Sequence, residues 1–245
     1  IDRFRLRFPL DIELDGVRII EASGDTMLSA RALIADVKMR PLLRLDAQLN
    51  RLELHDATYA MTSADSSLTL SLRAGYLRTE AGSYFNLRDM HLRLRQPVLK
   101  DAIVNVDMNV WKQQKDTASS TRFLIEADKL TLSRVTYSMT MPPVIASLSA
   151  TIDDGVVKDA SVNLTDSHLS FGSVDVRDGN VSYLTPTAEY IKAHPAPADT
   201  TSASSASPPM TIEIGDASLH FSRVLYATQN ARPLPGFDPS YIEVA

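Results

Sequence analysis

The sequence has 245 residues, no cysteine and a formal net charge of −5 at pH 7. The lack of cysteine excludes disulfides, thiol catalysis and thiolate metal sites. The negative charge, with no basic patch interleaved with aromatic residues, argues against a nucleic-acid partner held by phosphate contacts. Hydrophobic residues make up 44% of the chain, enough for one large β unit or two small ones.

No stretch of the sequence reaches the roughly 18 consecutive apolar residues of a membrane-spanning helix. The sequence begins with Ile1 and ends within an alternating run at 241–244. We therefore expect it to be a piece of a longer protein, with any targeting or anchoring segment elsewhere.

The first half of the chain alternates apolar and polar residues, which predicts β-strands with one apolar face. The first run, 4–14, predicts one long strand, and Pro9 places it at a sheet edge or at a local break. Pro41 and the two leucines after it predict a single helical turn at 41–45. Further strands are predicted at 33–39, 45–61, 68–77, 84–94 and 99–111, and the polar stretch 113–121 predicts a surface loop.

The stretch 123–183 has the most regular pattern in the chain. Its apolar residues follow one another in steps of two, with polar residues in nearly every gap. Steps of two place side chains on one face of a pleated strand. The stretch therefore predicts one long antiparallel sheet that is apolar on one side.

A recurring four-residue motif interrupts the steps of two with a step of three. It consists of an apolar residue, any residue, usually Asp and then a small residue; Gly16 takes the place of Asp in the first copy, and Arg does so in others. The copies begin at Leu14, Leu54, Leu99, Leu132, Ile152, Val157, Val176 and Phe221. Asp and Gly tolerate the backbone of a bulge or tight turn. Where alternation continues on both sides, as at 49–61, we predict a bend within one long strand, and repeated bends would curl the sheet.

The composition changes after Thr185. Residues 187–193 predict a short helix, and 194–209 consist almost entirely of Pro, Ala, Ser and Thr. Such a segment cannot bury enough apolar surface to order itself, so we predict a flexible, dispensable insertion at about 185–209. The alternating pattern resumes at Ile212. The chain 1–245 is therefore predicted to be a single all-β unit.

No catalytic or metal-binding constellation is found in the sequence. The five histidines (His55, His91, His168, His194 and His220) are scattered and read as solvated strand residues. Asp153-Asp154-Gly155 lacks the other ligands of a calcium loop and reads as a turn. No phosphate-binding glycine loop or G-x-S-x-G motif occurs. We expect no enzyme activity, no cofactor and no metal.

Several short segments resemble the N-terminal part of the TamB/AsmA-like envelope proteins. They are FPLDIELDGV at 8–17, GDTMLSA at 24–30, PLLR at 41–44 and LELHDATY at 52–59, while GFDPSYI at 236–242 resembles a segment of the Bacteroidota versions. The insertion departs from the family pattern, and the family's inner-membrane anchor and C-terminal domain are not in this sequence.

The resemblance implies an open, curled antiparallel sheet (a β-taco), with one or two short helical turns, whose groove is lined by aliphatic side chains. It also implies a periplasmic protein anchored in the inner membrane by a segment outside this sequence. Phospholipid is the implied cargo, carried towards the outer membrane. An outer-membrane barrel protein is the implied partner in outer-membrane biogenesis.

Two functions of different classes follow from the sequence. The first is a lipid-carrying groove, whose expected lining residues lie on the apolar path close to the bends: Leu132, Val135, Tyr137, Leu148, Val162 and Val176. The second is a non-enzymatic envelope scaffold whose apolar face closes as the dry core of a β-sandwich. The pattern alone favours the sandwich core, and the resemblance favours the groove.

Overall fold

The computed structural model describes residues 1–7, 11–20, 26–38, 46–62, 68–86, 89, 91–108, 124–142, 144–163, 168–193 and 211–245. Its strands are β1 (Arg3–Arg7), β2 (Asp11–Ile20), β3 (Thr26–Val37), β4 (Asp46–Thr62), β5 (Leu68–Thr79), β6 (Ser83–Asn86), β7 (His91–Leu94), β8 (Val98–Met108), β9 (Leu124–Met141), β10 (Ile145–Asn163), β11 (His168–Thr185), β12 (Thr211–Leu219), β13 (Arg223–Thr228) and β14 (Tyr241–Val244). Within these ranges α2 (Ala188–Ala193) is the only helix, as predicted for 187–193. The predicted helical turn at 41–45 and the insertion at 194–209 lie outside the described residues.

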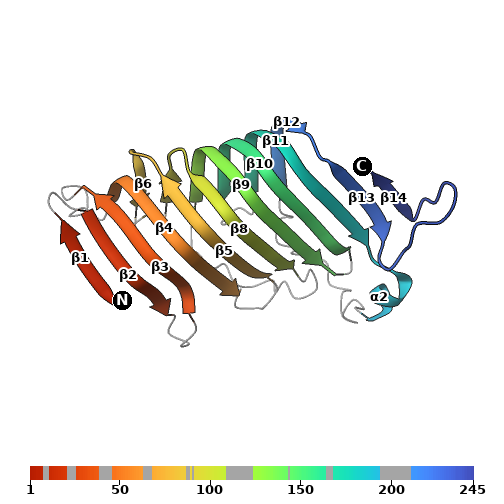
Figure 1. Ribbon diagram of the computed structural model, residues 1–245, viewed down its shortest axis with the longest axis horizontal. Helices are drawn as coiled ribbons and strands as arrows, with labels where there is room; N and C mark the ends of the chain where they lie inside the picture. The colour runs from red at the N-terminus through yellow and green to blue at the C-terminus, as the bar shows by residue number, and fades with distance from the viewer. Residues whose placement is uncertain are drawn as a thin grey trace, which may run out of the picture.

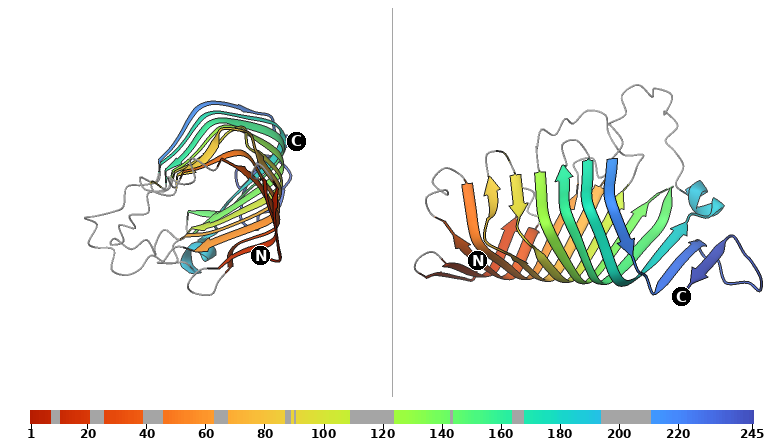
Figure 2. Two further views of the ribbon diagram at one scale, coloured as in Figure 1. Left: turned by 90° about the vertical axis from the view of Figure 1, so that its left-hand side faces the viewer. Right: turned by 90° about the horizontal axis from the view of Figure 1, so that it is seen from above.

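All described strands belong to one 14-stranded sheet, in the order β1-β2-β3-β4-β5-β8-β9-β10-β11-β13-β14 (Figure 1). Three strands lie off this order, each in line with a neighbouring strand of the chain. β6 follows β5 and pairs with β4, β7 precedes β8 and pairs with β9, and β12 precedes β13 and pairs with β11. The all-β class predicted from the sequence is therefore confirmed. Seen end-on, the strands bend and the sheet curls in a barrel-like way (Figure 2).

The first of two bends crosses the sheet where the four-residue motif predicted it. Gly16, Asp56, Asp101 and Arg134 each hold the third motif position, and each has a positive φ between 49° and 62°. They lie inside the strands β2, β4, β8 and β9, so the motif bends a strand without ending it. Asp and Gly occupy this left-handed region at lower cost than bulky residues do.

The second bend crosses β9 to β12 about two side-chain rows away from the first. Asp159 in β10 has φ +50°, and the register places it opposite Asp128 in β9 and Gly172 in β11. Gly172 in turn lies opposite Gly215 in β12, where an added Cβ would come within 2.7 Å of the Gly172 carbonyl oxygen. Close approach of the backbones therefore explains Gly215.

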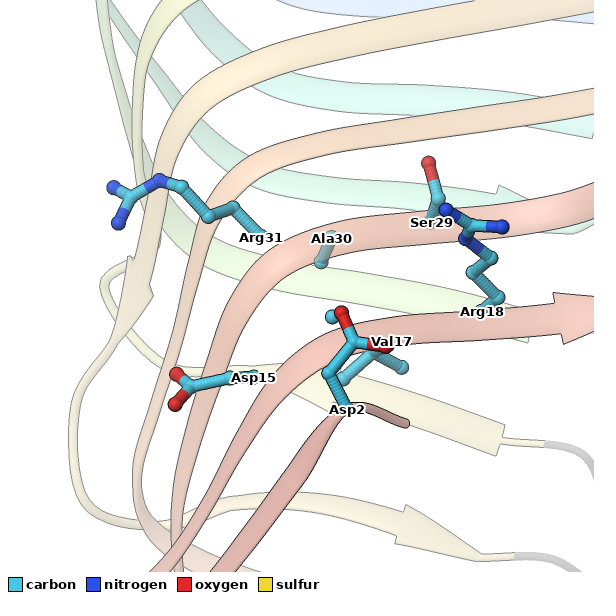
Figure 3. A pocket seen from close by; sticks show the side chains of 8 residues that line it. Asp2, Asp15, Val17, Arg18, Ser29, Ala30 and Arg31 are labelled. Carbon is cyan, nitrogen blue, oxygen red and sulfur yellow. The ribbon is translucent and has the colours of Figure 1, made fainter.

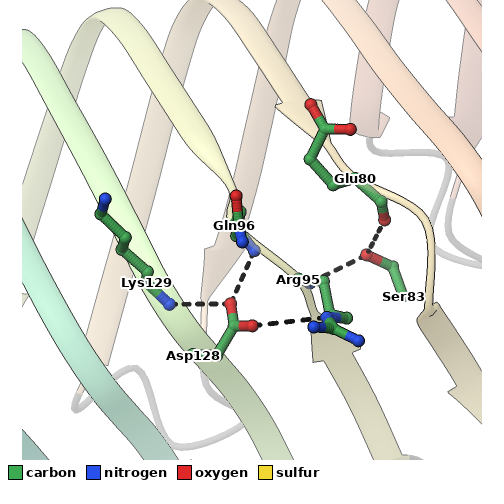
Figure 4. Close-up of polar contacts among 6 residues, drawn as sticks. All are labelled: Glu80, Ser83, Arg95, Gln96, Asp128 and Lys129. Carbon is green, nitrogen blue, oxygen red and sulfur yellow. Dashed lines mark hydrogen bonds and ion pairs between the residues drawn. The ribbon is translucent and has the colours of Figure 1, made fainter.

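Polar side chains satisfy the backbone where the second bend interrupts β5/β6 and β7/β8 (Figure 4). Asp128 accepts a hydrogen bond of 2.6 Å from the backbone N–H of Gln96, which has φ +44°, and pairs with Arg95 at 3.5 Å. The Ser83 hydroxyl donates to the Glu80 carbonyl and accepts from the Arg95 N–H, both at 2.9 Å. Such pairing allows a buried strand to break without leaving unsatisfied backbone groups.

Two rows of apolar residues line the concave side of the first bend, one on either side of it. The leucine row is Leu14, Leu33, Leu54, Leu77, Leu99, Leu132, Gly155 and Val176, each paired with the next across the sheet. The alanine row is Val17, Ala30, Ala57, Ala74, Ala102, Val135, Ile152 and Gly179. Members of the alanine row are among the most buried in the chain, with Ala102 only 1% exposed. Small residues fit there because the two sides of the bend converge.

The convex side of the first bend is charged. Arg134 donates from Nη2 to Asp101 Oδ2 at 2.8 Å, and Arg31 pairs with Asp56 on the neighbouring strands. The Arg134 guanidinium beside Asp101 holds the pKa of that carboxyl below its usual range. In Figure 3, Asp15 and Arg31 project from the outer side of the bend, away from Ala30.

The antiparallel sheet predicted for 123–183 is confirmed for β9, β10 and β11, but the sheet as a whole is not antiparallel throughout. The strands β7 and β8 pair with β9 in parallel, and β12 and β13 pair with β11 in parallel. Residues 109–123 connect the end of β8 to the start of β9, and α2 with 194–210 connects the end of β11 to the start of β12. Each connection returns to the end of the sheet at which the previous strand began, so the two strands run in the same direction. Side-chain alternation has the same period in both orientations, so the pattern did not reveal the direction.

Three local predictions also need correction. The run 4–14 forms two antiparallel strands, with Arg7 opposite Asp11, so the break allowed by Pro9 is the option realised. The run 84–94 likewise forms a hairpin, with Tyr84 opposite Arg93. The turn predicted at Asp153-Asp154-Gly155 is instead an irregular register within β10.

Replacing Asp101 by Val should lower the free energy of unfolding by about 1–2 kcal/mol, because a β-branched residue is strained at φ +52°. Asp101→Asn removes the same ion pair with Arg134 but tolerates this backbone, so its loss should be smaller. Arg73→Val, at an exposed position in β5, is the matched control. Urea unfolding midpoints measure all three, and equal losses for Asp101→Val and Arg73→Val would contradict the argument.

Candidate binding face

Most apolar residues of the bent strands lie on the concave side of the sheet, which we call the inner face; Ile34, Ile103 and Val156 are exceptions on the convex side. The two bends divide it into three parts. The base lies between the bends and contains the leucine row. The far arm is the part of the inner face that the first bend separates from the base, and the near arm is the part that the second bend separates from it.

Each arm continues the apolar rows across the strands. The far arm holds the rows Ile19, Leu28, Tyr59, Leu72, Val104, Tyr137, Ala150, Val181 and Val224, and Met61, Leu70, Val106, Met139, Leu148, Tyr183 and Tyr226. The row at the end of the near arm is Ala47, Phe85, Leu92, Ile125, Val162 and Leu169.

The structure places all six predicted lining residues on the inner face, but in different surroundings. Leu132, Val135 and Val176 flank the first bend and are buried, with 8%, 5% and 4% of their surface exposed. Tyr137 and Leu148 lie in the far arm, and Val162 lies in the near arm; all three are half-buried. The bend residues therefore belong to a packed corner, whereas the arm residues keep part of their surface exposed.

Partial exposure of the arms extends to the centre of the sheet. Leu148 in β10 has a hydrogen-bonded strand on either side, with Met139 in β9 and Tyr183 in β11 opposite it, and yet remains half-buried. Towards the last strands the exposure of far-arm residues increases, to 39% for Val224 and 43% for Tyr226. The helix α2 contains no buried residue. All described strands belong to the one curled sheet, so among the described residues no second sheet lies over the arms.

Tyrosines gather on the inner face of the far arm, where Tyr137 is the one predicted as a lining residue. The rings of Tyr183 and Tyr226 stack with centroids 5.7 Å apart and planes 14° apart. Tyr137 donates its hydroxyl to the Met139 sulfur at 3.3 Å, and burial raises the pKa of Tyr137. The signal was present in the sequence, because Tyr59, Tyr137 and Tyr183 fall in step with apolar neighbours on the same face.

The histidines interact more than the sequence suggested. His91 contacts the Tyr84 hydroxyl through Nδ1 at 3.1 Å and Glu126 Oε2 through Nε2 at 2.8 Å, and it is half-buried. These side chains lie on the convex face and do not reach the lining. Among the described residues, no group of three or more His, Asp or Glu residues could hold a metal ion.

A cavity of about 560 Å³ lies at the first bend of the N-terminal strands (Figure 3). It is lined by Asp2, Asp15, Gly16, Val17, Arg18, Ser29, Ala30 and Arg31. Carboxylates and guanidinium groups both border it, and none of the six predicted lining residues contributes to it. We therefore place the candidate site on the arms of the inner face.

Within the described part of the chain, no helix has the length and apolar character needed to cross a membrane. Comparison of the sequence with family models and curated proteins, and of the fold with solved structures, gives no match.

Proposed function

We propose that the inner face lines an open groove, a β-taco, that carries or shields phospholipid acyl chains. In this proposal the protein works in the periplasm, anchored to the inner membrane by a segment outside this sequence. It passes lipid towards the outer membrane and supports outer-membrane biogenesis with a barrel partner. The envelope location and the partner rest on the sequence resemblance alone.

The half-buried state of the arm residues is the observation that supports the groove. In a closed sandwich, a second apolar layer would cover central positions such as Leu148 in β10 and Tyr137 in β9. Both remain half-buried although hydrogen-bonded strands flank them on each side. Buried apolar residues are instead concentrated around the bends, as at Ala102 and Val135.

The chemistry of the lining suits acyl chains. Transfer of a methylene group from water to an apolar site gains about 0.8 kcal/mol, so several carbons lying along the aliphatic rows of one arm would give useful affinity. The far-arm row that begins at Ile19 runs from β2 to Val224 in β13 without an interrupting charge. An acyl chain could therefore move along this row without passing a charged side chain.

Native mass spectrometry of protein purified from bacterial membranes tests this proposal. We expect mass increments of one or more phospholipids that survive transfer into the gas phase. Protein that is folded by circular dichroism but carries no lipid, even after incubation with phosphatidylethanolamine vesicles, would refute the groove and leave the scaffold function.

A further inference from the structure

Aromatic side chains are sorted between the two arms of the inner face. Every tyrosine of this face lies in the far arm: Tyr59, Tyr137, Tyr183 and Tyr226. Among the described residues, the aromatic side chains facing inward in the near arm are Phe85 and Phe171. All eight tyrosines of the sequence fall within the described ranges, and the other four do not lie on this face. One arm of the lining therefore presents phenol groups, and the other presents hydrocarbon.

The phenol groups of the far arm are suited to binding the polar end of a ligand whose remainder is apolar. Tyr and Trp are enriched at membrane interfaces because one end of the side chain is apolar and the other forms hydrogen bonds. The Tyr137 hydroxyl donates to the Met139 sulfur, which is a weak acceptor. An ester carbonyl or phosphate oxygen would be a stronger acceptor. Tyr226 is 43% exposed and stacks on Tyr183, so this pair forms an accessible platform.

We propose that the far arm orients a bound phospholipid, with the glycerol ester and phosphate end against Tyr137, Tyr183 and Tyr226. The acyl chains then lie along the base and the phenylalanine-containing near arm. This inference rests on the proposed function and adds a direction to it, because lipid would travel along the sheet with its polar end always on the same side.

The test compares two ligands that share only apolar character. Dioctanoyl phosphatidylcholine has ester and phosphate acceptors, whereas diphenylhexatriene is a hydrocarbon that fluoresces in apolar sites. In the variant Tyr137→Phe, Tyr183→Phe, Tyr226→Phe, the rings remain and the hydroxyls are lost. We expect roughly tenfold weaker phospholipid binding, as for one or two lost hydrogen bonds, with unchanged diphenylhexatriene binding.

Tyr76→Phe is the matched control, because Tyr76 lies on the convex face beside His55 and Lys100, and this variant should bind both ligands normally. Equal loss of both ligands in the triple variant would show that the rings only maintain packing and would overturn the inference. Unchanged phospholipid binding would also overturn it and leave the groove standing. A wild-type protein that binds neither ligand would refute the proposed function itself.

Discussion

Gly179→Ala should destabilise the fold by about 1–3 kcal/mol or more, the range found for overpacking of a well-packed site. Gly179 ends the alanine row in β11, opposite Ile152 in β10. A Cβ added there would lie 2.1 Å from the Thr151 carbonyl oxygen and 3.3 Å from the Ile152 Cα. These are backbone atoms of a paired strand, so the clash is relieved only by separating β10 from β11 at the bend.

The stabilisation that alanine gives by restricting the unfolded chain is too small to offset this clash. Replacing Gly by Ala at a compatible backbone stabilises a protein by about 0.4–1 kcal/mol, through the unfolded state. Gly75→Ala provides the comparison within the same bend, because its Cβ would approach the Asp101 Cβ only to 3.0 Å, a milder overlap than the one at Gly179. Urea unfolding should show a clearly larger loss for Gly179→Ala, and a Gly179→Ala protein as stable as the wild type would show that the strands separate without cost.

The positions of the bends could be predicted from the sequence because they depend on local backbone chemistry. Asp56, Asp101 and Asp159 occupy the third motif position, and all three adopt the left-handed backbone. The continuity of the apolar face followed from the same observation, since a step of three across a bend keeps both residues on one side. Leu54 and Ala57, in the leucine and alanine rows, illustrate this relation.

Strand direction and hairpin positions could not be read from alternation. The β6–β7 hairpin was missed although its signal is local: the Asp89 N–H donates to Asn86 Oδ1 at 3.0 Å, and Asn86 Nδ2 donates to Asp89 Oδ2 at 2.9 Å. Asn and Asp at that spacing favour a turn. The parallel pairing of β8 with β9 depends on where the chain re-enters the sheet, which no local pattern encodes.

The candidate lining could be assigned to a face, but its accessibility could not be predicted. Val135 and Leu148 look alike in the sequence, as apolar residues on one alternating path. Cross-strand register places Val135 in the converging corner, at 5% exposure, and leaves Leu148 half-buried in the far arm. That difference arises only when the bends of neighbouring strands align.

Leu148→Glu should abolish phospholipid binding while the fold survives. In the empty groove, the new carboxylate at this half-buried position would remain hydrated, so the cost to folding is small. With phospholipid bound it would lie beside Tyr183, where we place the anionic ester and phosphate end of the lipid, and would be desolvated there without a positive partner, at a cost of several kcal/mol. Val162→Glu, in the near arm, should behave in the same way. Circular dichroism melting and bound phospholipid per protein are measured together.

Two matched variants make the outcome decisive. Ser149→Glu changes the neighbouring residue on the opposite face, paired with Ser138 and Ser182, and should affect neither folding nor lipid. Val135→Glu places the same charge in the buried corner and should unfold the protein whether the face is open or closed. If Leu148→Glu unfolds as Val135→Glu does, the face is a dry sandwich core and the groove is refuted. If Leu148→Glu melts like Ser149→Glu and loses its lipid, the arms form an open lining whose accessible apolar surface binds acyl chains.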